Sequence, residues 1–159
     1  MSEPNLDRRE LLRGGGAAAA AGALSLAAGR PAAAAAKVPI VALADLKPGV
    51  PVEFDYPEDA PALLVDLGER VEGGVGPNGS ILAVSTLCQH MGCPVKWDPT
   101  SRELVCHCHG SRYDLVRGGM AVEGAATRGL PRIALAVEDG RIVATGVADG
   151  LVYGFACHA

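Results

Sequence analysis

The chain contains 159 residues, carries a formal net charge of −4 at pH 7 and has only 4% aromatic residues. This length suits one folded domain, and the excess of acidic side chains argues against a nucleic-acid-binding surface. The sequence also lacks a run of basic residues and a glycine-rich loop with phosphate-binding spacing. We therefore expect no nucleic acid among the partners of this protein.

Residues 1–36 have the features of an export signal. Two adjacent arginines and two leucines within residues 7–13 are similar to a twin-arginine motif, and residues 14–28 are mostly Gly, Ala and Leu. The alanines at 32–36 supply small residues of the kind found at signal cleavage sites. A spanning helix needs about 18 or more apolar residues, so this run is short for a membrane anchor. We predict export of the folded protein to the periplasm by the twin-arginine route, with membrane association only through an uncleaved leader.

Residues 37–159 are predicted to form one all-β domain. Short apolar segments alternate with turns rich in the 21 glycines and 11 prolines of the chain, and no amphipathic helix follows the leader. The expected strands are 50–54, 62–67, 80–85, 95–97, 103–106, 131–137, 141–146 and 152–155. This pattern favours an antiparallel β-sandwich.

Cysteine and histidine are concentrated in two boxes. Four of the five cysteines and three of the four histidines lie within them. Box one is Cys88-Gln89-His90-Met91-Gly92-Cys93, and box two is Cys106-His107-Cys108-His109-Gly110-Ser111-Arg112-Tyr113. Residues 95–97 and 103–106, between the boxes, are expected to pair as a hairpin that brings them together. Trp97, in the first of these strands, is expected to pack beneath the site.

Each box offers one thiolate and one imidazole, as C-x-H in box one and C-x-x-H in box two. Two thiolates and two imidazoles suit either a zinc ion or an iron–sulfur cluster with mixed ligation. In the iron interpretation, Cys88 and Cys106 bind one iron, while His90 and His109 bind the other. His107 fits the spacing less well than His109, and we expect it to face solvent or a partner.

Two further cysteines, Cys93 and Cys108, would lie close together in the folded hairpin. A disulfide between them would close a loop of about 15 residues and contribute roughly 3 kcal/mol. Zinc sites rarely carry a second, interleaved cysteine pair, so we favour the iron–sulfur cluster. A structural zinc site and a disulfide knot without metal are the alternatives. Cys157 and His158 are expected to belong to a frayed C-terminal tail rather than to a second site.

The two boxes resemble those of Rieske [2Fe–2S] proteins, whose pattern is C-x-H-x-G-C followed by C-x-C-H-G-S. The resemblance implies one [2Fe–2S] cluster in loops at about 86–126, which form a small subdomain inserted into the sandwich. Its implied ligands are Cys88, His90, Cys106 and His109. Cys93 and Cys108 correspond to the disulfide of the family. Glycines 118, 119 and 124 are expected in a loop that covers the other side of the cluster.

Two hydroxyl residues of box two also match the family pattern. In high-potential Rieske proteins, the hydroxyls at the positions of Ser111 and Tyr113 donate hydrogen bonds to a cluster sulfide and to a ligand cysteine sulfur. Such donors stabilise the reduced cluster and raise its potential. The resemblance thus implies a high-potential cluster in this chain.

The sequence contains no recognisable catalytic acid–base pair or nucleophile, so we expect the chain to carry electrons and to have no catalytic residues of its own. Beyond the boxes, most of residues 50–155 resemble the small subunit of arsenite oxidase, on the stretches 56–59, 73–77, 85–88, 124–131 and 152–154. This resemblance implies a large partner subunit with a molybdenum–pterin centre that oxidises arsenite to arsenate. Electrons would then pass through this chain to a periplasmic cytochrome c or copper protein.

Three alternatives to an arsenite oxidase subunit stay open. The first is the small subunit of a related molybdenum oxidoreductase, such as an iodate reductase. The second is the Rieske subunit of a cytochrome bc complex, although residues 14–28 are short for the anchor expected there. The third is a zinc-stabilised β-module without a redox role, which the colour of the purified protein would distinguish.

Overall fold

A computed structural model describes residues 36–150, 152 and 153 of the chain. The predicted leader therefore lies outside the described residues, except for Ala36, and so do Cys157 and His158. Among the described residues, no helix has the length and apolar character needed to cross a membrane.

The strands of the described residues form three antiparallel sheets. The first sheet has the order β1 (Val38–Ala42), β10 (Arg141–Val147) and β9 (Ile133–Glu138), with the short 3₁₀ helix η2 (Leu43–Asp45) after β1. The second has the order β2 (Val52–Asp55), β3 (Pro61–Asp66) and β4 (Ile81–Ser85). The third has the order β5 (Lys96–Asp98), β6 (Glu103–Val105), β7 (Arg112–Asp114) and β8 (Met120–Glu123).

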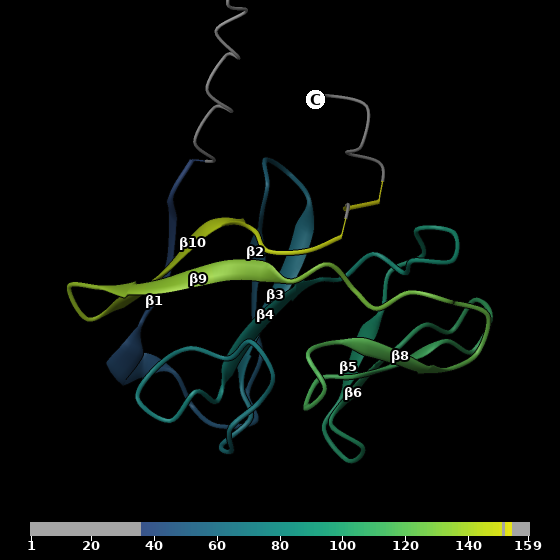
Figure 1. Cartoon of the computed structure of the whole chain (residues 1–159), viewed down its shortest axis with the longest axis horizontal. Helices are drawn as coiled ribbons and strands as arrows, with labels where there is room; N and C mark the ends of the chain where they lie inside the picture. Colours follow the sequence, from purple (N-terminus) through teal and green to yellow (C-terminus); the bar gives the residue numbers. More distant parts are fainter. Residues whose placement is uncertain (1–35, 151, 154–159) are drawn as a thin grey trace, which may run out of the picture. The chain divides into compact units, whose positions relative to one another are not determined.

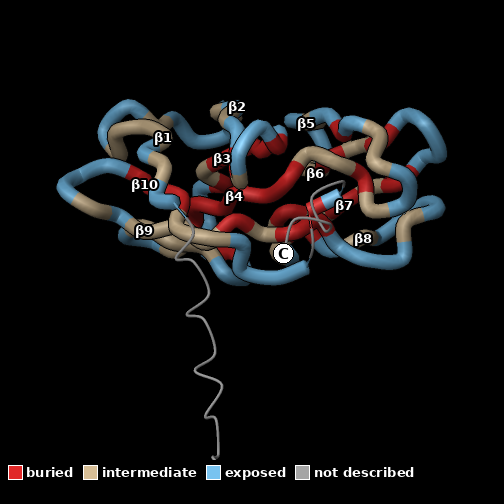
Figure 2. Tube along the Cα trace, turned by 90° about the horizontal axis from the view of Figure 1, so that it is seen from above, coloured by how far each residue is buried: buried red, intermediate tan, exposed pale blue. Residues whose placement is uncertain are grey.

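Two strands of the second sheet, β3 and β4, are buried on both faces. Along β3, Leu63 and Val65 point into one core and Leu64 points into the other, because successive side chains of a strand face opposite sides. The core that contains Leu64 also receives Ile133 and Ile142 from the first sheet. Figures 1 and 2 both show β3 and β4 between the first sheet and the third, and Figure 2 shows them as buried. Burial on two sides explains why these strands are continuous apolar runs.

The third sheet is an insertion between β4 and β9 that carries both boxes (Figure 1). Box one connects β4 to β5, and box two connects β6 to β7. Leu104 of β6, Tyr113 of β7 and Leu115 pack into the same core as Leu63 and Val65. The predicted fold, an antiparallel sandwich with an inserted small subdomain, is confirmed.

The strand predictions differ from the structure mainly at short strands. β1, β7 and β8 were not expected, because β1 contains a proline and the other two lie in the segment dominated by ligand and turn residues. A final strand at 152–155 was wrong for Val152 and Tyr153, which are not in a strand; residues 154 and 155 lie outside the described part. Within β9, Ile133 is buried, whereas Val137, near the end of the strand, is 42% exposed.

Candidate metal centre

Box one folds into a tight hydrogen-bonded turn. The backbone N–H of Cys88 donates to the carbonyl of Cys93 at 2.8 Å, and that of Gly92 donates to the carbonyl of Cys88 at 2.8 Å. Gly92 has a φ of 73°, which glycine adopts without strain. A Cβ at Gly92 would also come within 2.4 Å of the Tyr153 ring, so a side chain there would have to displace that ring.

Box two repeats the same turn. The N–H of Cys106 donates to the carbonyl of Ser111 at 2.8 Å, and that of Gly110 donates to the carbonyl of Cys106 at 3.0 Å. Gly110 has a φ of 70°, close to the value at Gly92 in box one. The first cysteine of each box therefore opens an equivalent turn, although the boxes differ in the spacing of their histidines.

A third loop packs against box two. A Cβ at Gly124 would lie only 2.4 Å from the Cα of Ser111, so glycine permits this close approach. The N–H of Ala126 donates to the Ser111 hydroxyl at 3.0 Å. The expectation of a covering loop was wrong for glycines 118 and 119: they turn the chain after β7, where Gly118 lies near Glu72 and Arg132 and Gly119 near Val84 and Leu130.

The four predicted ligands form two pairs of like atoms. Cys88 and Cys106 are each 1% exposed, belong to the same hydrophobic core and are close enough for the Cys106 thiol to affect the pKa of Cys88. His90 and His109 are exposed, with their Nδ1 atoms 3.2 Å apart and their rings nearly perpendicular at 88°. The sulfur pair therefore lies on the core side and the nitrogen pair on the solvent side. A cluster in which one iron takes two thiolates and the other two imidazoles fits this arrangement.

The arrangement fits a single zinc ion less well. Among the described residues, the group of three potential ligands whose donor atoms all lie within 4.8 Å of each other is Cys93, Cys106 and Cys108. Two members of this group form a disulfide, so the group is not a metal site. A tetrahedral zinc ion needs four donors gathered around one point, and the four predicted ligands are arranged in pairs instead.

A disulfide joins the two boxes. Cys93 and Cys108 are bonded, with their Cα atoms 6.6 Å apart, and they are 15 positions apart in the sequence. This is the pair that the resemblance implied. Because one cysteine belongs to each box, the bond holds the two turns side by side and leaves Cys88 and Cys106 as free thiols.

The Tyr113 hydroxyl lies against one of these thiols. Its oxygen is 3.1 Å from the Cys88 sulfur and accepts a hydrogen bond of 3.0 Å from the backbone N–H of Gln89. Because the oxygen accepts from Gln89, its own proton is available to the sulfur. Burial and the neighbouring Cys88 sulfur raise the pKa of Tyr113 far above its usual value, so the hydroxyl remains a protonated donor.

Burial and hydrogen bonds both act on the pKa values of the two free thiols. Burial raises the pKa of the Cys88 thiol, but hydrogen bonds from the Tyr113 hydroxyl, the His90 N–H and the Cys106 thiol outweigh this effect, so its pKa is lowered. Burial raises the pKa of Cys106. Metal ions bind thiolates, so the hydrogen bonds to Cys88 favour the form that binds a metal.

The other candidate residues lie apart from the four donors. His107 is exposed and lines a different hollow, with Lys96, Trp97 and Arg112. Trp97 packs at the edge of the core that contains Cys88. A hollow of about 720 Å³ lies beside Phe54 and Trp97, and none of the four predicted ligands lines it.

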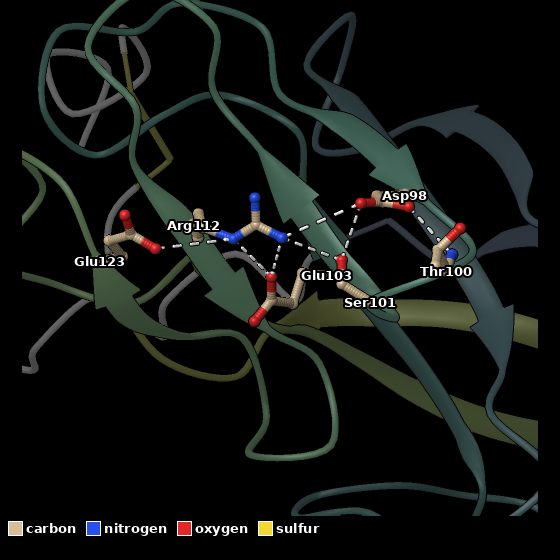
Figure 3. A network of polar contacts seen from close by, with 6 residues as sticks. All are labelled: Asp98, Thr100, Ser101, Glu103, Arg112 and Glu123. Carbon is tan, nitrogen blue, oxygen red and sulfur yellow. Dashed lines mark hydrogen bonds and ion pairs between the residues drawn. The ribbon is translucent and has the colours of Figure 1, made fainter.

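Two features of the site did not follow from the sequence. One is the backbone N–H of Gln89, because a backbone donor leaves no sequence pattern. The other is a network of charges around Arg112 (Figure 3). Arg112 lies between Ser111 and Tyr113 in the sequence. Acidic residues at 98, 103 and 123 could have indicated this network. They are far apart in the sequence, however, and come together only across the folded sheet.

The fold and site define a β-sandwich with an inserted subdomain that presents two thiols and two imidazoles from two disulfide-linked loops. Residues 36–145 match the sequence model of the Rieske [2Fe–2S] domain, so the chain belongs to this family. The domain is one that binds a [2Fe–2S] cluster and transfers electrons.

Curated relatives include two subunits of iodate reductase. The chain is 40% identical over 125 residues to iodate reductase subunit IdrB of Denitromonas iodatirespirans, covering 76% of this chain and 67% of the relative. It is 41% identical over 120 residues to the same subunit of Pseudomonas sp. (strain SCT), covering 73% of this chain and 62% of the relative. The cytochrome b6-f complex iron–sulfur subunit of Chlorobaculum tepidum is 38% identical over 69 residues, or 43% of this chain and 37% of that protein.

Solved structures show the same fold. The soluble domain of the Rieske protein II (soxF) of Sulfolobus acidocaldarius superposes with a TM-score of 0.60 at 26% identity, covering 73% of this chain and 82% of that one. The plasma membrane Rieske protein PetC3 of Synechocystis PCC 6803 gives a TM-score of 0.55 at 30% identity, covering 69% of this chain and 99% of that one.

Proposed function

We propose that this chain is the Rieske electron-transfer subunit of a molybdenum-containing oxidoreductase of the iodate reductase kind. The observation that carries the proposal is the extent of the match to the two iodate reductase subunits, which covers 76% and 73% of this chain. The match to the cytochrome b6-f subunit covers only 43%. The similarity to the iodate reductase subunits thus extends to strands outside the boxes. Binding of a cluster does not by itself explain similarity in these strands.

The residues of the site have distinct roles in this proposal. Cys88 and Cys106 would hold one iron, and His90 and His109 would hold the other. The bound cluster supplies one-electron transfer. The exposed imidazoles offer the shortest path for electrons between the cluster and a docked protein, while Tyr113 and Ser111 donate hydrogen bonds that raise the reduction potential.

The partners in this proposal are a large catalytic subunit with a molybdenum–pterin centre and a periplasmic cytochrome c or copper protein. The substrate chemistry belongs to the large subunit. The direction of electron flow depends on that chemistry, toward the large subunit for iodate reduction and away from it for arsenite oxidation. Export by the twin-arginine leader at residues 1–36 would deliver the folded protein, with its cluster, to an oxidising compartment where the disulfide is stable.

A second candidate is the small subunit of an arsenite oxidase. The observation that favours it is the resemblance on residues 56–59, 73–77 and 124–131, outside the ligand boxes. This was the main interpretation of the sequence. The two curated iodate reductase relatives support the alternative better.

One experiment separates the two candidates. The protein is isolated from its native source with whatever co-purifies, and the electron paramagnetic resonance signal of the reduced cluster is followed without oxygen. For an iodate reductase, iodate added to the reduced complex removes the signal, and arsenite added to the oxidised complex has no effect. For an arsenite oxidase, arsenite makes the signal grow in. A complex that contains the cluster but no molybdenum would contradict both candidates.

A further inference from the structure

The strand β7 carries Tyr113, and Ser111 immediately precedes it. Both residues are fully buried, at 0% exposure. Between them, Arg112 faces the opposite side of the sheet, because side chains of a strand alternate. The positions of both proposed hydroxyl donors therefore depend on how firmly this three-residue strand is held.

Arg112 is the centre of a polar network that spans the third sheet (Figure 3). Its Nε donates to Oε2 of Glu103 at 2.7 Å, and its Nη2 donates to the Ser101 hydroxyl at 3.1 Å. Carboxylate oxygens of Asp98 and Glu123 each lie 3.9 Å from the guanidinium. We call Arg112 with these four residues the Arg112 network. It connects β7 to β6, to the turn between β5 and β6, and to β8.

The backbone alone holds β7 less firmly on one side. Toward β6, the pairing of Arg112 with Val105 and of Tyr113 with Leu104 is regular. Toward β8, the register shifts between Arg112 and Tyr113, since Arg112 pairs with Glu123 but Tyr113 pairs with Ala121. A bulge interrupts the ladder of backbone hydrogen bonds and lets the strand bend. The Arg112 network lies across this interruption.

The Arg112–Glu103 pair is partly shielded from water, which strengthens it. The side chains of Arg112 and Glu103 are 30% and 19% exposed, whereas each described ion pair outside the network has a partner that is 45% exposed or more. Asp98 and Glu123, at the edge of the network, are more exposed. Two nitrogens of the planar Arg112 guanidinium contact one oxygen, Oε2 of Glu103, and a lysine cannot reproduce this arrangement. Arg112 is thus suited to hold β7 in one register.

We propose that Arg112 is a positioning residue for the redox centre, which acts through Tyr113. By fixing β7 against β6 and β8, it holds the Tyr113 hydroxyl at hydrogen-bonding distance from the Cys88 sulfur. This inference rests on the proposed function, in which Cys88 is a ligand and Tyr113 raises the reduction potential. Loss of the Arg112 network would lengthen the hydrogen bond between Tyr113 and Cys88 and lower the potential, without contact between Arg112 and any ligand.

A double-mutant cycle tests whether Arg112 acts through Tyr113. The midpoint potential is measured by redox titration of the holoprotein for the wild type, Arg112→Gln, Tyr113→Phe and the double variant, with the cluster content of each checked by iron analysis. We expect each single substitution to lower the potential and the double variant to match Tyr113→Phe, because the hydroxyl through which Arg112 acts is gone. Fully additive shifts, or an unchanged potential in Arg112→Gln, would overturn the inference.

A control variant separates positioning from general destabilisation. Arg102 makes a comparable set of contacts, to the Glu69 carboxylate at 2.6 Å and to the Leu67 carbonyl at 2.7 Å, but it lies outside β7. Arg102→Gln should reduce the unfolding midpoint and leave the potential unchanged. Equal shifts in potential for Arg102→Gln and Arg112→Gln would mean that any loss of stability changes the potential, which also contradicts a specific role for Arg112.

A second variant separates positioning from the charge of the network. Glu103→Ala removes a negative charge, which raises the potential if the network acts only through its electric field. If the network acts by holding β7, the same substitution lowers the potential, because Arg112 loses its main partner. A rise or no change in Glu103→Ala would therefore overturn the inference.

These experiments also distinguish a failure of the inference from a failure of the proposed function. If Tyr113→Phe lowers the potential and Arg112→Gln does not, Tyr113 keeps its role and Arg112 loses the one proposed here. If Tyr113→Phe leaves the potential unchanged, the role of Tyr113 in the proposed function is wrong, and the inference fails with it. Arg112→Lys keeps the positive charge but loses the planar guanidinium. It should show a fall in potential that is smaller than that of Arg112→Gln.

Discussion

The hydroxyl oxygen of Tyr113 lies 3.1 Å from the Cys88 sulfur, and the two residues are 25 positions apart in the sequence. The same oxygen accepts a hydrogen bond from the N–H of Gln89, the residue next to Cys88. Tyr113 thus contacts both the side chain of one proposed ligand and the backbone that follows it. This double contact joins box two to box one within the core. The disulfide between Cys93 and Cys108 is a second connection between the boxes.

Removal of the Tyr113 hydroxyl should lower the reduction potential. Tyr113→Phe keeps the buried ring and removes one hydrogen bond to a sulfur that becomes more negative on reduction. If the bond is stronger in the reduced state by about 1.4 kcal/mol, the potential falls by about 59 mV, since the couple transfers one electron. Redox titration of the holoprotein measures this shift. An unchanged potential would show that the hydroxyl does not stabilise the reduced state.

Removal of the Ser111 hydroxyl should affect both stability and potential. The hydroxyl accepts a hydrogen bond from the N–H of Ala126 at 3.0 Å, so Ser111→Ala leaves that N–H without its partner. We expect a loss of about 1–3 kcal/mol in the free energy of unfolding and a fall in potential. Thr145→Ala is a matched control, because the Thr145 hydroxyl donates to the Ala134 carbonyl at 3.2 Å in another sheet. The control should lower stability alone, and equal potentials for Ser111→Ala and the wild type would contradict the proposed role.

The histidines of box two should differ in their effect on the cluster. His109 faces His90 with Nδ1 atoms 3.2 Å apart, whereas His107 lines a separate hollow. His109→Ala should therefore abolish the electron paramagnetic resonance signal typical of mixed ligation, and His107→Ala should retain two irons and two sulfides per chain. Iron and acid-labile sulfide analysis checks both variants. Zinc in the wild-type protein, or loss of iron from His107→Ala alone, would contradict the proposed ligand set.

The disulfide should stabilise the two loops. Replacement of Cys93 and Cys108 by alanine opens a loop of 15 residues, which predicts a loss of roughly 3 kcal/mol in the free energy of unfolding. The cluster should also dissociate faster, because the two turns are no longer held side by side. Denaturant unfolding and the decay of the visible absorbance measure the two effects. Wild-type protein treated with a reductant should behave like the variant, and identical stability of both forms would contradict this role.

Acid should weaken the turn between β5 and β6. Hydrogen bonds from the Thr100 N–H and the Ser101 hydroxyl lower the pKa of Asp98 below 3.8. A carboxylate with a lowered pKa in the folded state contributes stability above its unfolded pKa, and this stability is lost as the pH falls through the folded pKa. Asp98→Asn should therefore flatten the fall in denaturation midpoint between about pH 5 and pH 2. Parallel curves for the variant and the wild type would show that Asp98 does not contribute.

The chemistry of the site was readable in the sequence because metal binding restricts both residue type and spacing. The spacing of the cysteines and histidines in the two boxes identified the candidate ligands. The glycines within the boxes indicated where each turn reverses the chain. The apolar runs at β3 and β4 and the Asp139-Gly140 turn between β9 and β10 were equally predictable, since burial and turn geometry act on residues close together in the chain.

Only the tertiary structure decided which of the proposed ligands are buried and which are exposed. Nothing local indicates that Cys88 and Cys106 are both 1% exposed while the histidines beside them are exposed, because the core is shared with Leu63 and Val65 of a distant strand. The contacts of Tyr113 with Gln89 also join residues that are far apart in the sequence. Such contacts depend on strand register, and the bulge beside Tyr113 shows that register does not follow from counting residues. The sequence thus specifies the proposed donors of this centre, whereas packing across three sheets places them and the hydroxyl groups beside them.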